Sequence, residues 1–61
     1  MTRVLNVANL QLGDTLVDNH VSYVVSNIEQ DKYSYDLQLM DSTGAKISKC
    51  VPADHQVIID L

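Results

Sequence analysis

Two runs of alternating apolar and polar side chains, residues 33–40 and 45–51, flank the short polar sequence DSTG at residues 41–44. Asp is favoured at the first position of a type I turn because its carboxylate accepts nearby backbone N–H groups. Gly is favoured at the fourth position because it tolerates a positive φ. The pattern therefore predicts a β-hairpin with a G1 bulge at Gly44, in which Asp41 faces residue 45 across the ladder.

The same register continues outward from the turn and gives the hairpin two different faces. Leu39 is opposite Ile47 and Leu37 is opposite Lys49, and every second residue of a strand shares a face. The apolar face, predicted to enter the core, carries Tyr35, Leu37, Leu39, Ile47 and Val51. The polar face, predicted to meet water, carries Asp36, Gln38, Met40, Lys46 and Ser48.

This register puts one cation, Lys49, on the apolar face. A lysine at the margin of a sheet can lay its stem along apolar side chains and extend its ammonium group to water. Two alternatives stay open: Lys49 is a binding residue, or the turn differs by one residue and the faces of one strand are exchanged.

The segments before the hairpin are short, rich in β-branched residues and separated by polar turns. Residues 11–17 and 21–28 read as strands, and alternation breaks at Val24-Val25, which indicates a bulge. Residues 2–10 fit a strand with a turn at Asn9 about as well as a short amphipathic helix, and we favour the strand.

The segment after the hairpin predicts one more strand. Pro52 cannot donate a ladder hydrogen bond and is expected to end the strand before it. Residues 53–55 fit a one-turn 3-10 segment, and residues 56–61 resume as a final short strand. We therefore predict an all-β domain over residues 1–61, with five short antiparallel strands in a small barrel and the 3-10 segment before the last strand.

The chain resembles the SH3-like small barrels, the architecture of SH3, Tudor and KOW-type modules. The resemblance rests on LGDTL at residues 12–16, STG at 42–44 and VPADHQV at 51–57, and it implies this barrel over residues 10–61. The functions of these modules do not carry over. The chain has no Trp for a polyproline groove, only three Tyr for a methyl-lysine cage and only four Lys and Arg for an RNA surface.

Length, charge and cysteine content limit the possible functions and locations of the protein. A chain of 61 residues buries only about 60% of the surface that its unfolded form exposes, so its stability is marginal and we expect self-association to extend the core. A net charge of −4 disfavours binding to a phosphate backbone and favours a protein partner. Because the chain is acidic, a basic protein is the partner that its charge favours. The single Cys50 and the absence of a long apolar run at the amino terminus predict a cytoplasmic protein without membrane contact.

No arrangement of residues demands a particular chemistry. His20, His55 and Cys50 are too few for a structural zinc site, which needs four Cys or His ligands. Cys50 and His55 lack an orienting third group and an oxyanion site, so Cys50 is expected to be a small, buried or half-buried strand residue. The eight acidic residues are dispersed, which favours solubility, with a spatial acidic patch as the functional alternative. We expect no enzymatic activity, no cofactor and no metal.

The sequence therefore predicts a non-catalytic protein-binding module, an adaptor, inhibitor or regulator of a size that suits a phage or mobile element. Exposed tyrosines and polar turn residues often anchor protein contacts. The candidate contact residues are Tyr23, Tyr33, Lys49, Asp18, His20 and Asp31. One alternative is a homo-oligomer whose β-edges pair between copies. The other is a nucleic-acid-binding barrel that uses Lys32, Tyr33, Lys46 and Lys49, or an oligomer in which the lysines of several copies converge.

Overall fold

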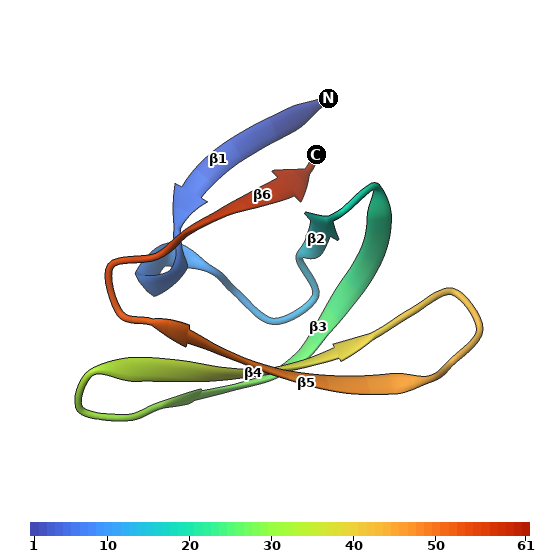
Figure 1. The fold of residues 1–61 in the computed structure, drawn as a ribbon. Coiled ribbons are helices and arrows are strands. Elements are labelled where there is room, and N and C mark those ends of the chain that lie inside the picture. Colours follow the sequence, from blue (N-terminus) through green and yellow to red (C-terminus); the bar gives the residue numbers. More distant parts are fainter.

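The computed structural model describes all 61 residues and consists of six strands and one 3-10 helix (Figure 1). The strands are β1 (Thr2–Asn6), β2 (Thr15–Asp18), β3 (Val21–Gln30), β4 (Ser34–Met40), β5 (Lys46–Pro52) and β6 (Gln56–Asp60). The 3-10 helix η1 (Val7–Asn9) follows β1 directly. All neighbouring strands are antiparallel, in the order β1-β6-β2-β3-β4-β5. The all-β prediction is confirmed, with six strands where five were expected.

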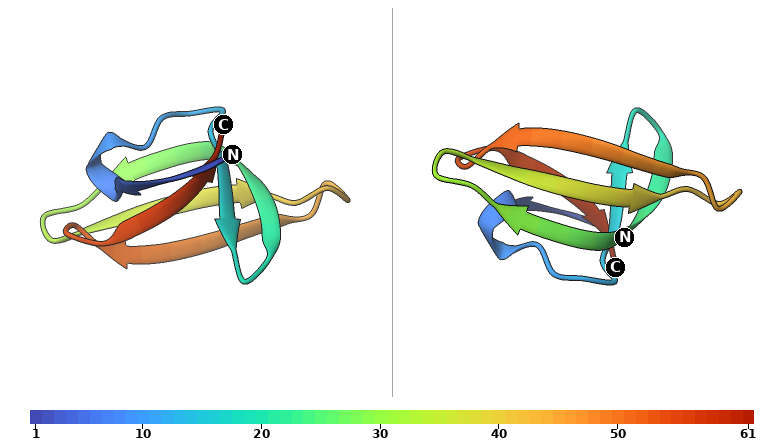
Figure 2. Two further views of the ribbon diagram at one scale, coloured as in Figure 1. Left: turned by 90° about the horizontal axis from the view of Figure 1, so that it is seen from above. Right: turned by 90° about the horizontal axis from the view of Figure 1, so that it is seen from below.

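The sheet curls into a small barrel-like shape because one strand belongs to both of its halves. The first residues of β3 pair with β2, and its last residues pair with β4. The register shifts between Val25 and Asn27, next to the break in alternation seen in the sequence. A bulge bends its strand and increases the local twist. As a result, β1, β6 and β2 lie across β3, β4 and β5 (Figures 1 and 2).

The β4–β5 hairpin has the predicted register. Leu39 lies opposite Ile47 and Leu37 lies opposite Lys49. The alternative in which a different turn exchanges the faces of one strand is therefore wrong. Lys49 is half-buried on β5, which is an edge strand, as expected for a lysine at a sheet margin.

The turn of this hairpin is built from the residues that predicted it. The Asp41 N–H donates to the Ala45 carbonyl at 3.0 Å, and the Gly44 N–H donates to the Asp41 carbonyl at 3.1 Å. Gly44 has φ +87°, the left-handed conformation that Gly adopts without strain. The Asp41 carboxylate accepts the N–H groups of Thr43 and Ala45, both at 2.9 Å, and the Thr43 hydroxyl at 2.6 Å. One side chain thus connects both sides of the turn.

We predict that Asp41 makes the stability of the fold depend on pH. The Thr43 hydroxyl and the Ala45 N–H hold the pKa of the Asp41 carboxyl below its ordinary value of 3.8. A depressed pKa stabilises the folded state above the unfolded pKa, and this contribution is lost as pH falls through the folded value. Between about pH 6 and about pH 2.5, the urea midpoint of the wild type should therefore fall further than that of Asp41→Asn. The wild type and Asp41→Asn have all other carboxyl groups in common, so an equal fall in the urea midpoints of the two proteins would contradict the prediction.

The core is a single apolar cluster with no buried polar or charged residue. Its buried members are Val7, Leu10, Leu16, Val25, Leu37, Leu39, Val51, Val57 and Ile59. Of the apolar hairpin face, Leu37, Leu39 and Val51 are buried as predicted, and Tyr35 is half-buried against them.

Two hairpin residues are more exposed than predicted. Ile47 was expected in the core but is 40% exposed, because it lies near the tip of a hairpin that projects past the other strands (Figure 2). Cys50 was expected to be buried or half-buried but is exposed, because it is opposite Asp36 on the outer, polar face.

The connections around the barrel also differ from the prediction in detail. The 3-10 helix lies at Val7–Asn9, where the Asn6 side chain accepts the Ala8 N–H at 2.9 Å and caps it. The expected 3-10 segment before β6 is a tight turn, in which the His55 N–H donates to the Pro52 carbonyl at 3.0 Å. The favoured strand for the amino-terminal segment is confirmed, and its chain turns in η1.

Candidate functional site

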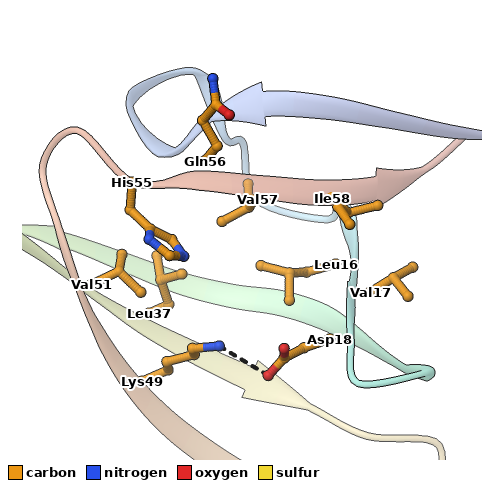
Figure 3. A pocket seen from close by; sticks show the side chains of 10 residues that line it. All are labelled: Leu16, Val17, Asp18, Leu37, Lys49, Val51, His55, Gln56, Val57 and Ile58. Carbon is orange, nitrogen blue, oxygen red and sulfur yellow. Dashed lines mark hydrogen bonds and ion pairs between the residues drawn. The ribbon is translucent and has the colours of Figure 1, made fainter.

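The barrel is open along one side. β5 and β6 are consecutive in the chain but are not paired with each other, so β5 has a free edge. A hollow of about 110 Å³ lies in this opening, between β5 on one side and β6 and β2 on the other (Figure 3). We call this opening the seam and its cavity the seam hollow.

The seam hollow has an apolar floor and a partly polar rim. Its floor is formed by buried residues of four strands, namely Leu16, Leu37, Val51 and Val57. The rim carries Val17, Asp18, Lys49, His55, Gln56 and Ile58. In Figure 3 the His55 ring points from the β5–β6 turn toward Val51 and Leu37. Apolar walls with a few polar groups are the lining typical of ligand pockets, although this hollow is smaller than most of them.

One ion pair crosses the seam. The Lys49 Nζ on β5 donates to the Asp18 Oδ2 at the end of β2 at 2.9 Å (Figure 3). The two side chains are 37% and 51% exposed, so water screens the pair and its net contribution to stability is roughly 0–1 kcal/mol. Its main consequence is positional, because it places one cation and one anion at the mouth of an apolar hollow.

The pair also joins two of the six predicted contact residues, which are 31 positions apart in the sequence. Sequence reasoning selected Lys49 and Asp18 separately and did not predict that they meet. It missed Val17, the neighbour of Asp18, and three rim residues beyond β5, namely His55, Gln56 and Ile58. The only sequence signal for these three is their place directly after the strand that carries Lys49 and Pro52.

The structure places the other predicted contact residues elsewhere. Tyr23 is half-buried on β3 and packs against the core opposite Leu16. Tyr33 is 76% exposed in the β3–β4 turn, with the Lys32 Nζ 5.4 Å from its ring centroid. His20 and Asp31 are exposed turn residues. None of these side chains lines the seam hollow.

The lysines of the nucleic-acid alternative do not converge. Lys32 precedes Tyr33, whose carbonyl accepts the Ala53 N–H beyond the end of β5, whereas Lys46 begins β5. The two lysines are therefore separated by the length of that strand, roughly 20 Å at 3.3 Å per residue. Lys49, between them, is paired with Asp18.

No group of three or more His, Cys, Asp or Glu side chains is placed to hold a metal ion. The structure also has no helix of the length and hydrophobicity needed to cross a membrane. Comparison with known proteins finds no family model that matches the chain and no curated protein that is significantly similar to it.

Proposed function

We propose that this chain is a non-catalytic protein-binding module on a small SH3-like barrel, and that it binds its partner at the seam. One observation carries the proposal: the free edge of β5 lies beside a hollow with an apolar floor and an ion pair at its mouth. A strand edge supplies backbone hydrogen bonds to a partner, and an adjacent pocket selects one of its side chains.

The size and chemistry of the seam favour a protein over other partners. A hollow of about 110 Å³ accommodates a single side chain, whereas drug-sized ligands need clefts of about 300–1,000 Å³. The SH3-like assignment is supported by five strands, β2 to β6, which follow the expected order along the chain, while β1 adds a sixth beside β6. The proposal keeps the cytoplasmic location expected from the sequence.

The test is partner capture with matched surface variants. Ile58→Glu places a carboxylate on the rim of the seam hollow, and Val24→Glu places one on the outer face of β3, away from it. The two residues are 44% and 48% exposed, so both variants should fold, which circular dichroism checks. We expect the immobilised wild type and Val24→Glu to capture the same protein from a lysate of the source organism, and Ile58→Glu to lose it. If Ile58→Glu retains the partner, or if nucleic acid is recovered in place of a protein, the proposal is wrong.

A further inference from the structure

We infer that the partner binds as an extended strand, antiparallel to β5, with apolar residues opposite Lys49 and Ile47 and an acidic residue opposite Lys46. In partner order this is the pattern apolar, any residue, apolar, acidic. The inference rests on the proposed function and deepens it, because it names the chemistry of the segment that the seam accepts.

Half of the backbone groups of β5 are free to bind a partner strand. In an antiparallel ladder, hydrogen-bonded pairs alternate with pairs that make no bonds. Asp41 bonds to Ala45 and Tyr33 bonds to Ala53, in the same register. The odd-numbered residues of β5 therefore bond to β4. The N–H and carbonyl groups that point to the free edge belong to Lys46, Ser48 and Cys50.

The register of β5 decides where the side chains of an added strand would lie. Residues directly opposite one another in a sheet share a face. Partner residues opposite Ile47 and Lys49 therefore lie on the inward face of the hairpin. The residue opposite Lys49 lies beside the seam hollow, which Lys49 lines, and the residue opposite Ile47 lies next to that exposed apolar side chain near the hairpin tip. A sealed cavity of about 150 Å³ holds benzene, so the seam hollow of about 110 Å³ fits one Val or Leu side chain.

The charges of the two edge strands are all positive. Of the four Lys and Arg residues, Arg3 lies on β1 and Lys46 and Lys49 lie on β5, the two free edge strands. None of the eight acidic residues lies on either strand. The ion pairs of the structure join Lys49 to Asp18 and the amino terminus to Asp60, which leaves Lys46 without an acidic partner.

This distribution favours an acidic segment over a second copy of the chain. Like charges directly opposite each other destabilise a sheet pair, and charged edges guard against pairing between copies. A β5 edge that met β5 or β1 of another copy would join two strands that carry cations and no acidic residue of their own, so Lys46 would gain no acidic partner from the added strand. The net charge of −4 indicated a basic partner, but the edge that is free to bind is locally cationic.

The test uses the full chain, labelled with ¹⁵N, and a capped peptide of sequence STVTVETS. Antiparallel addition puts its first Val opposite Lys49, its second Val opposite Ile47 and its Glu opposite Lys46. At up to low millimolar peptide we expect saturable amide shifts, and slower hydrogen exchange at Lys46, Ser48 and Cys50. Replacing the first Val of the peptide by Ala should weaken binding about ten-fold, because two apolar carbons leave the hollow.

Two chain variants separate the backbone and charge parts of the inference. Ser48→Pro removes an edge N–H that the β4–β5 ladder does not use, so the variant should fold and lose the peptide. Lys46→Glu should weaken binding about two- to five-fold, the range of an exposed ion pair. A peptide with Lys in place of Glu should restore binding to that variant.

Several results would overturn the inference. One is the absence of saturable shifts on β5 in a folded chain, and another is undiminished binding by Ser48→Pro. A third is a wild-type dimer in sedimentation velocity whose β5 edge amides are protected without peptide, since a second copy would then be the occupant. If Ile58→Glu loses the captured partner and Ser48→Pro keeps it, strand addition is wrong while partner binding at the seam still stands.

Discussion

Leu37→Ala is expected to lower the free energy of unfolding by about 3 kcal/mol, within the range of 2–5 kcal/mol for buried Leu→Ala changes. Leu37 is 0% exposed and lies in the middle of β4, between Ile28 on β3 and Lys49 on β5. A domain of this size has a total stability of roughly 3–9 kcal/mol, so this one change removes a large part of it. Urea unfolding followed by far-UV circular dichroism measures the loss.

Two further variants separate burial from other effects of this change. Leu12→Ala removes the same atoms from a side chain that is 64% exposed, and should change stability by no more than about 0.5 kcal/mol. Leu37→Met conserves volume and should cost less than about 1.5 kcal/mol. Because Leu37 also lines the seam hollow, the Ala variant enlarges an existing hollow. Similar losses for Leu12→Ala and Leu37→Ala would contradict the core position of β4.

The hairpin that contains Leu37 could be predicted in register because all of its signals are local. Asp41 and Gly44 each suit one position of the turn, and alternation on both sides then fixes every pair. The exposure of Ile47 could not be predicted in this way. Whether an inward-facing residue is buried depends on which other element covers it, and the tip of this hairpin extends past the strands opposite (Figure 2).

The candidate site was predictable only in part, for a related reason. Lys49 stood out because a cation in an apolar register is expected at a sheet margin or at a binding site. In the structure it lies on the edge strand β5 and lines the seam hollow. Its pairing with Asp18 depends on the way the curled sheet brings the end of β2 to the edge of β5 (Figure 3). No local pattern encodes the separation of β5 and β6, so His55 and Ile58 carried no sequence signal for the site beyond their place after the strand that contains Lys49.

The amino-terminal segment was ambiguous because its apolar residues satisfy two periods at once. In a helix, Val4 and Val7 lie on the same face, three residues apart. In the structure they differ sharply: Val4 is 58% exposed on the outer face of β1, whereas Val7 is 1% exposed in η1. The Val7 N–H also donates to the His55 carbonyl at 2.8 Å, which anchors η1 at the start of β6.

The burial of Val7 and the exposure of Val4 predict different losses of stability when each is shortened. Val7→Ala should lower the free energy of unfolding by about 2 kcal/mol, because two buried carbons are lost and the closely packed core leaves a cavity behind. Val4→Ala deletes the same two carbons from an exposed edge strand and should cost no more than about 0.5 kcal/mol. Urea midpoints of the two variants, measured side by side, test both values.

The two variants differ mainly in side-chain burial, because they carry the same substitution within the same segment of the chain. Both replace Val by Ala, and the backbone hydrogen bond of Val7 to His55 is kept, since Ala retains its N–H. The difference of about 1.5 kcal/mol between them therefore reports side-chain burial. A helix over residues 2–10 would place both side chains against the core and give nearly equal losses. Equal losses would thus contradict β1, which is the strand beyond the five that the sequence predicted.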